Sequence, residues 1–227
     1  EEHRFGVRQK EQLKKFSHGV HYLALSATPI PRSLQLAFSG LRALSALVTP
    51  PEGRKPIRTE ILRYHPNRII DEIQQELNRG GQVFFVHNRV QSLAGVARWL
   101  QQQLPEVQIG IAHGQMDKDL LESVMLQFTR RELQILVCTT IIESGIDLPQ
   151  VNCMIINRAE QFGLAQLHQL RGRIGRGSHE SFCILVSNSD GVEARDRLRV
   201  LEETTDGFKI AEADLQLRGP GELLGQL

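Results

Sequence analysis

The stretch Gly81-Gln-Val-Phe-Phe-Val-His-Asn-Arg89 contains the pattern that decides the fold of this chain. Its apolar run from Gln82 to Val86 is typical of a β-strand, and Gly80 and Gly81 before it are typical of the end of a helix. From Val90 to Leu104, apolar residues then recur at the spacing of a helix. A strand between two amphipathic helices is the repeating unit of an α/β fold.

The same alternation of strands and helices continues along the chain. Further strands are predicted at 57–63, 107–112, 134–138, 152–157 and 181–187, and further helices at 67–78, 117–129, 163–170 and 193–203. Asp117 is expected to cap the helix that begins there. Helices of this length between strands imply crossover connections, and therefore a mostly parallel sheet with helices on both faces.

Composition limits the classes of function that the chain can have. Of its 227 residues, 41% are hydrophobic and 23% are charged, which is typical of a globular protein with a sizeable core. The formal net charge is only +1, so any binding of nucleic acid must depend on local basic patches. No apolar run approaches the roughly 18 residues of a membrane span, and the first residues do not resemble a signal peptide. We therefore expect a soluble protein without a membrane partner.

The three cysteines, Cys138, Cys153 and Cys183, each lie in an apolar run that is typical of a strand. This position favours small buried thiols over disulfides and metal ligands, and it indicates a reducing, cytoplasmic compartment. The eight histidines show no metal-ligand spacing with these cysteines, so no metal site is predicted. Trp99 is expected to pack in the core.

The segment Gln169-Leu-Arg-Gly-Arg-Ile-Gly-Arg-Gly177 contains three arginines and three glycines in nine residues. Arginine binds anionic oxygens through a planar, permanently charged guanidinium, and glycine lets the backbone approach a ligand closely. A triphosphate and a nucleic-acid backbone are the ligands that this chemistry favours. The alternative interpretation is a solvated basic surface loop.

Three polar stretches follow predicted strands, and they help to decide between these interpretations. They are His87-Asn-Arg89, His113-Gly-Gln115 and the longer stretch from Thr139 to Asp147. In a parallel sheet, ligands bind at the edge where the strands end and the loops begin. Because the three stretches converge on this edge, the sequence favours a binding site over a solvated loop.

Four stretches, in order along the chain, resemble the motifs of the superfamily 2 DExH helicases and translocases. Glu1 to Gly6 resembles the end of a D-E-x-H box, and Ser26-Ala-Thr-Pro29 resembles motif III. Leu136 to Asp147 resembles motif V, and Gln169 to Arg176 resembles motif VI. Four motifs in the family's order are far more specific than one cluster of glycine and arginine.

Within this superfamily, the chain is similar to the RecG/Mfd group of double-stranded DNA translocases over nearly its whole length. The stretches that resemble this group are Ala27 to Arg32, His113 to Met116, Phe162 to Arg171 and Leu217 to Gly225. The stretches Gly81 to Arg89, His113 to Met116 and Cys138 to Gly145 are more similar to the Mfd members, the transcription-repair coupling factors. The stretch Thr205 to Gly221 is more similar to the RecG members, which remodel replication forks. We favour the Mfd members.

The resemblance implies a RecA-like α/β fold in a motor of two lobes, with ATP in the cleft between them and duplex DNA across one face. Residues 1–50 would be the C-terminal end of the first lobe, with a strand predicted at 20–25 and a helix at 32–41. Residues 51–188 would be the second lobe, and residues 189–227 the translocation motif, a helical hairpin and loop. An alternative is a non-catalytic RecA-like binding module.

The resemblance also implies a catalytic role for three residues. Arg173 and Arg176 match arginine fingers, which stabilise the charge on the γ-phosphate during phosphoryl transfer to water. Glu1 matches the glutamate that orients or deprotonates that water. The matching cofactor-binding residues are His3, Gly145, Asp147 and Gln169. For Asp147, a loop-capping carboxylate is the alternative role.

Residues at the strand ends match the nucleic-acid contacts of the family. They are Arg89, His113, Gly114, Thr139 and Thr140, which would bind the phosphate backbone without reading the base sequence. Ser26, Thr28 and Arg218 match residues that couple nucleotide turnover to movement along DNA. A structural role is the alternative for His113, and it is the favoured interpretation of His168.

Two elements of the family are absent from the sequence. There is no G-x-x-x-x-G-K-[ST] loop, which cradles the phosphates and holds Mg²⁺ through its hydroxyl, and no Asp precedes Glu1. We therefore expect ATP and Mg²⁺ to be bound mainly by residues outside this chain, which alone should hydrolyse no ATP above background. The implied partners are double-stranded DNA and, through regions outside the chain, RNA polymerase and nucleotide excision repair proteins.

Overall fold

The computed structural model describes residues 23, 45, 55–140, 151–177, 179–189 and 191–218. Apart from Leu23, the strand predicted at 20–25 and the helix predicted at 32–41 lie outside these residues. The chain divides into two compact units. One spans Leu47–Thr205 and contains the sheet, whereas helix α8 (Gly207–Arg218) belongs to the other, together with Glu1–Ala46.

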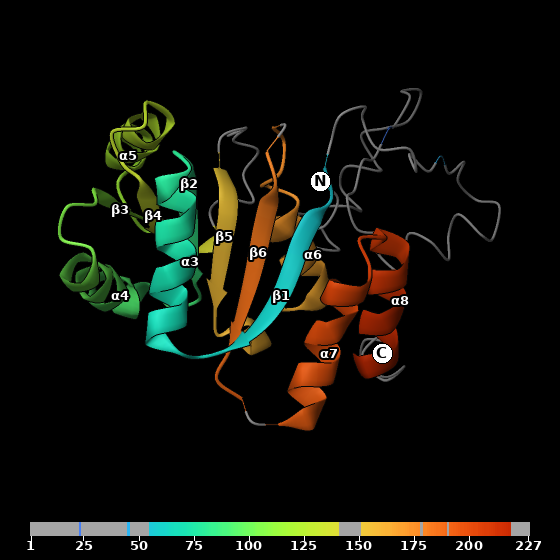
Figure 1. Cartoon of the computed structure of the whole chain (residues 1–227). Coiled ribbons are helices and arrows are strands. Elements are labelled where there is room, and N and C mark those ends of the chain that lie inside the picture. The colour runs from blue at the N-terminus through green and yellow to red at the C-terminus, as the bar shows by residue number, and fades with distance from the viewer. Residues whose placement is uncertain are drawn as a thin grey trace. The chain divides into compact units, whose positions relative to one another are not determined.

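The first unit is built on a sheet in which the described residues form six strands, all parallel, in the order β1-β6-β5-β2-β4-β3 (Figure 1). The strands are β1 (Ile57–Arg63), β2 (Gln82–His87), β3 (Ile109–Ala112), β4 (Ile135–Cys138), β5 (Val151–Asn157) and β6 (Ser181–Ser187). Since all strands run in one direction, all six carboxyl ends lie at one edge of the sheet and all six amino ends at the other. This confirms the predicted parallel sheet.

Helices cover both faces of this sheet, as predicted. They are α3 (Pro66–Asn78), α4 (Val90–Gln103), α5 (Lys118–Thr129), α6 (Leu164–Arg171) and α7 (Val192–Glu203), with a 3-10 turn η3 (Ala159–Gln161). In Figure 1, α3 lies in front of the sheet and α6 behind it. Buried side chains of α3 and α4 form one core cluster with Phe85 and its neighbours on the same face. On the opposite face, the Phe128 ring of α5 lies 5.3 Å from the Phe84 ring.

The predicted element bounds agree with the structure to within about two residues, and the largest difference is at β3. That strand begins at Ile109, because the residues before it form a turn after α4. The backbone N–H of Val107 donates to Leu104 O at 3.2 Å, and Gln101 Nε2 donates to carbonyl oxygens of the same turn. The predicted cap of α5 is confirmed, since Asp117 accepts from the N–H groups of Asp119 and Leu120 at 3.0 and 3.4 Å.

The predicted core residues are also confirmed. All three cysteines are buried and free, and burial raises the pKa of Cys183 to about 12 and that of Cys138 above its ordinary range. They are therefore uncharged thiols at neutral pH. Trp99 packs against the core cluster of α3 and α4. No helix in the described part of the chain is both long and apolar enough to cross a bilayer.

The boundary expected at residues 188 and 189 does not coincide with the limit of the first unit. Helix α7 lies beyond it in sequence, yet it packs beside β1 within the unit that ends at Thr205. Glu202 Oε1 accepts from the backbone N–H of Ile61 at 2.8 Å, which satisfies a donor of this edge strand. The assignment of 189–227 to a translocation motif stays a prediction.

Candidate functional site

The carboxyl edge of the sheet is centred on His87, the last residue of β2, whose exposed fraction is 3%. Its Nδ1 lies 3.2 Å from Nδ2 of Asn157, the residue opposite it on β5, and its Nε2 lies 2.7 Å from Ser92 Oγ. Burial lowers the pKa of His87, and the positive charges of Arg158 and Arg89 lower it further. His87 is therefore neutral, with Nδ1 accepting from the Asn157 amide and Nε2 donating to Ser92.

Two arginines flank this buried histidine. Arg89 is exposed and precedes the first turn of α4, whereas Arg158 is half-buried and directly follows β5. Arg158 has a left-handed backbone, with φ of 56°, a conformation that costs a non-glycine residue about 1 kcal/mol or more. Among the described residues, none forms an ion pair with either guanidinium.

The loops after β3 and β4 lie beside each other at the same edge. The backbone N–H of Thr139 donates to Ala112 O at 3.2 Å, which places Thr139 next to His113. His113, Thr139 and Thr140 are half-buried, and Gly114 is exposed. In the described part of the chain, the buried Nδ1 of His113 has no hydrogen-bond partner. The predicted nucleic-acid residues therefore share one edge of the sheet with Arg158 and Asn157, which the sequence interpretation missed.

Arg173 and Arg176 lie at the opposite, amino edge of the sheet. They belong to the arginine loop, which we define as residues 172–177, 179 and 180 between α6 and β6. Gly175 in this loop has φ of 72°, and a Cβ atom there would lie 2.8 Å from Cγ1 of Ile57, the first residue of β1. Arg173 is half-buried and Arg176 exposed, and Gln169 is half-buried on α6.

Arg171, the first arginine of the segment from Gln169 to Gly177, is buried and binds other parts of the protein. It is 3% exposed, and its Nη1 donates to Leu201 O at 2.5 Å and to Thr59 Oγ1 at 3.2 Å. Its Nη2 donates to Thr204 O at 3.1 Å and lies 3.1 Å from Nδ1 of His168. Arg171 therefore ties α6 to β1 and to the C-terminal end of α7, and its contact with His168 agrees with a structural role for that histidine.

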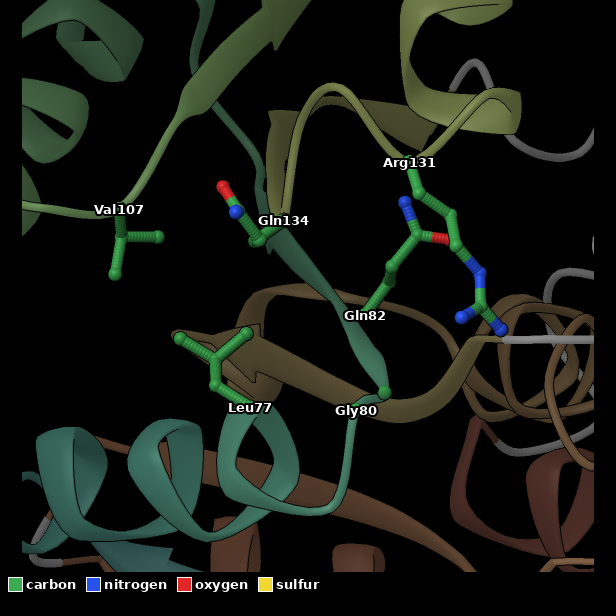
Figure 2. Close-up of a pocket in the computed structure, with 7 residues that line it drawn as sticks. Leu77, Gly80, Gln82, Val107, Arg131 and Gln134 are labelled. Carbon is green, nitrogen blue, oxygen red and sulfur yellow. The ribbon is translucent and has the colours of Figure 1, made fainter.

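A pocket of about 330 Å³ also lies at the amino edge, and it contains none of the predicted site residues (Figure 2). Its lining consists of Leu77, Gly80, Gly81, Gln82, Val107, Arg131 and Gln134. Gln82 Nε2 donates to Phe128 O and Leu133 O at 2.7 Å, and Gln134 Oε1 accepts from Gln108 N at 2.7 Å. Because these polar groups bind the protein itself, the pocket does not have the character of a ligand site.

Several predicted residues lie outside the described part of the chain. They are Glu1, His3, Ser26, Thr28, Gly145 and Asp147. The backbone of Arg218 ends α8, but its side chain is not described. Among the residues that are described, no group of three or more His, Cys, Asp or Glu side chains could hold a metal ion. The roles predicted for all these residues stay predictions.

Comparison with known proteins agrees with this architecture. Residues 65–178, half of the chain, match the model of the helicase conserved C-terminal domain. The chain is 51% identical to a transcription-repair-coupling factor of Myxococcus xanthus, with 99% of the chain and 19% of that protein covered. It is 46% identical to the transcription-repair-coupling factor of Helicobacter pylori strain J99, with 100% of the chain and 23% of that protein covered. The chain thus spans about a fifth of the length of these relatives.

Among solved structures, RecG bound to a three-way DNA junction is similar to this chain, with a TM-score of 0.74 and 36% sequence identity. The alignment covers 97% of this chain and 36% of the RecG chain. The parallel sheet, the family model and these relatives agree with the resemblance of the motifs to superfamily 2 helicases. The chain belongs to the helicase conserved C-terminal domain family.

Proposed function

We propose that this chain forms the second RecA-like lobe and adjoining segments of an ATP-dependent double-stranded DNA translocase that acts in DNA repair. Its role would be in transcription-coupled repair, where such a motor displaces stalled RNA polymerase. The observation that carries the proposal is the separation of two arginine-containing sites at opposite edges of one sheet. A motor needs one site for nucleotide and one for DNA, joined by a rigid element.

The amino edge is the proposed nucleotide side. Arg173 and Arg176 of the arginine loop would reach a γ-phosphate held by the first lobe and stabilise the charge that develops there. In this proposal Glu1 acts on the attacking water. His3, Gly145, Asp147 and Gln169 contact the nucleotide. ATP and Mg²⁺ are held mainly by residues outside the chain, because the sequence has no phosphate-binding loop of the G-x-x-x-x-G-K-[ST] type.

The carboxyl edge is the proposed DNA side. Arg89 supplies an exposed positive charge, Thr139 and Thr140 supply hydroxyl groups, and Gly114 is an exposed residue whose backbone N–H is the proposed donor. Such groups bind phosphate oxygens and carry no information on base sequence, which suits a motor that moves along any DNA. Arg158 is a further phosphate contact in this proposal, because no described residue neutralises its charge.

Three further residues have a proposed role in coupling, and the proposed protein partners bind elsewhere. Ser26, Thr28 and Arg218 couple closure of the lobes to movement on DNA. RNA polymerase and nucleotide excision repair proteins bind through regions outside this chain, in the cytoplasm. A fork-remodelling helicase is the second candidate, supported by the likeness to RecG on a three-way junction. A non-catalytic binding module is less well supported, because a scaffold has no use for two arginines directed at a γ-phosphate.

The test of the proposal is Arg173→Ala in an intact protein that contains both lobes. Removal of an arginine finger lowers ATP turnover by about a thousandfold or more, whereas duplex DNA affinity should change less than about twofold. Steady-state ATPase and DNA-binding assays measure the two effects. Normal turnover with lost DNA binding would contradict the proposal. Displacement of stalled RNA polymerase by the same protein, compared with unwinding of a three-way junction, distinguishes the two candidate functions.

A further inference from the structure

Arg79, at the C-terminal end of α3, connects that helix to the arginine loop. Its Nε donates to Glu76 Oε2 at 2.7 Å, and its Nη2 also contacts this oxygen. The same Nη2 donates to the backbone carbonyl of Glu180 at 2.8 Å, and Glu180 is the last residue of the loop. The guanidinium carbon lies 5.1 Å from the ring centre of Phe182 on β6. One side chain thus bridges α3, the end of the loop and the start of β6.

Glu76 holds Arg79 in this orientation from a buried position. It is 3% exposed, and its second oxygen, Oε1, has no hydrogen-bond partner in the described part of the chain. Burial raises the pKa of Glu76, and the hydrogen bond and charge of Arg79, followed by the charge of His179, oppose this shift. An ion pair with a buried carboxylate is weak evidence for stability, because the cost of removing the charge from water offsets much of the attraction.

The Glu76 carboxylate has room in the structure because residue 81 is a glycine and has no side chain. A Cβ atom on Gly81 would lie 1.7 Å from Glu76 Oε1, so any other residue there would displace the carboxylate. The backbone N–H of Gly81 donates to Glu76 O at 3.0 Å, which fixes the two residues beside each other. The carboxylate of this ion pair is buried, the Arg79 side chain is partly exposed, and the pair needs a glycine beside it. We therefore look for its role in the loop that Arg79 contacts.

The arginine loop is held at both ends and in the middle. At its start, the N–H groups of Gly172 and Arg173 donate to His168 O and Leu170 O at 3.0 and 2.9 Å. In its middle, Gly175 packs on Ile57, and at its end Arg79 binds Glu180 O. The Arg79 contact comes from α3, a helix that does not adjoin the loop in the sequence.

We infer that Glu76 and Arg79 are positioning residues for Arg173 and Arg176. They hold the C-terminal end of the arginine loop against the sheet, so that the two guanidinium groups are directed toward the nucleotide without further ordering. The inference rests on the proposed function of the loop. In this inference Glu76 and Arg79 act through the loop and not on the nucleotide, so their effect is on the rate of the chemical step and not on nucleotide affinity.

The experiment uses the intact two-lobed protein and compares Arg79→Ala and Glu76→Gln with Arg68→Ala. Misplacement of a catalytic group by about 1 Å can cost about a hundredfold, so kcat for ATP should fall about tenfold to a hundredfold in the first two variants. The KM for ATP and the affinity for duplex DNA should change less than about threefold in the same variants. Arg68 also pairs with a glutamate on α3, Glu72 at 3.0 Å, but it is exposed, so its removal should leave kcat unchanged.

Two further variants distinguish a loss of loop positioning from a general loss of stability as the cause of a lower kcat. Arg79→Lys retains a charge that can bind Glu76 or Glu180 O and should recover part of the lost kcat. Gly81→Ala keeps both charged residues but displaces the Glu76 carboxylate, so kcat should again fall while KM stays within about threefold. A kcat within twofold of the unmodified protein in Arg79→Ala and Gly81→Ala overturns the inference. Parallel losses of DNA affinity, nucleotide affinity and thermal stability also overturn it.

Arg173→Ala, measured beside these variants, separates this inference from the proposed function. If Arg173→Ala has normal turnover, the proposed function fails. If Arg173→Ala abolishes turnover while Arg79→Ala retains it, only the positioning inference fails.

Discussion

The two edges of the sheet use arginine in opposite ways. At the carboxyl edge, Arg89 and Arg158 flank a buried neutral histidine, and no described residue forms an ion pair with them. At the amino edge, Arg171 donates hydrogen bonds to Leu201 O, Thr204 O and Thr59 Oγ1, and Arg79 bridges Glu76 and Glu180 O. At the carboxyl edge the two arginines lack an ion-pair partner among the described residues, whereas at the amino edge Arg171 and Arg79 bind backbone carbonyls.

The composition of an arginine-rich segment therefore does not reveal which of its arginines are buried and which are exposed to solvent. Arg171 and Arg176 lie five residues apart in one segment, but the first is 3% exposed and the second is exposed. A buried guanidinium that is bound to backbone carbonyls rigidifies the protein, because it satisfies acceptors that would otherwise be unpaired. In the proposed function, Arg173 and Arg176 need such a rigid support, because preorganised charges stabilise a transition state best.

The largest effect is expected when the buried arginine of this segment is removed. Arg171→Ala leaves the carbonyls of Leu201 and Thr204 without their donor, and hydrogen bonds to a charged group contribute about 1.5–3 kcal/mol each, so stability should fall by about 3 kcal/mol or more. Urea unfolding, followed by the fluorescence of Trp99, the one tryptophan in the sequence, measures this loss. Arg176→Ala is the matched control and should change stability by about 0.5 kcal/mol or less. An equal loss of stability in Arg171→Ala and Arg176→Ala would contradict the prediction that the buried hydrogen bonds of Arg171 stabilise the fold.

An intermediate effect, on DNA affinity, is expected at the carboxyl edge from Arg158→Gly. This change removes the charge and also relieves the left-handed backbone, so stability should not fall. Loss of one phosphate contact should weaken duplex binding by about tenfold or less and reduce the slope of log K against log salt by about 0.9. Titrations of the intact protein with duplex DNA at several salt concentrations measure both quantities.

Arg131→Gly is the control for Arg158→Gly, because it makes the same substitution at the opposite edge of the sheet. Arg131 also has a left-handed backbone, with φ of 63°, but it lies in the turn before β4, at the amino edge. Its replacement should have a similar effect on backbone strain and leave DNA affinity within about twofold. Equal weakening of DNA binding by Arg131→Gly and Arg158→Gly would contradict the assignment of DNA to the carboxyl edge.

The fold could be predicted from the sequence because its signals are local and repeated. The apolar runs of β2 and β6 and the periodic apolar positions of α3 and α4 give element type without knowledge of contacts. The start of β3 could not be predicted, since it depends on Gln101, whose side chain binds three carbonyls of the preceding turn. A hydrogen bond between a helix side chain and a later turn produces no periodic pattern in the sequence.

The candidate site was predictable only in part, for a similar reason. His113 and Thr139 directly follow predicted strands and Arg89 comes three residues after one, so the rule that ligands bind at strand ends places them at one edge. Arg158 follows β5 in the same manner, and the same rule, applied to every strand, would have found it. The roles of Arg171 and Arg79 could not be predicted, because their partners lie 30 and 101 residues away in the sequence.

The smallest of the expected effects is a pH dependence of the free energy of unfolding that arises from His87. Burial, Arg158 and Arg89 lower its pKa in the folded protein below its ordinary value of 6.5. As the pH falls through 6.5, the unfolded chain binds a proton at this residue and the folded protein does not, so the free energy of unfolding decreases. Above that pH, His87 contributes no pH dependence. The loss from one such group at pH 6 is less than about 1 kcal/mol.

His87→Gln removes this titration, and its amide can still bind the Ser92 hydroxyl and the Asn157 amide. The difference in free energy of unfolding between pH 7.5 and pH 6 should therefore become smaller than in the unmodified chain. Because Arg158 and Arg89 both lower the pKa of His87, Arg158→Gly should also reduce the pH dependence. If it does not, the Arg158 guanidinium is too far from His87 to lie beside Arg89 at the proposed DNA-binding edge.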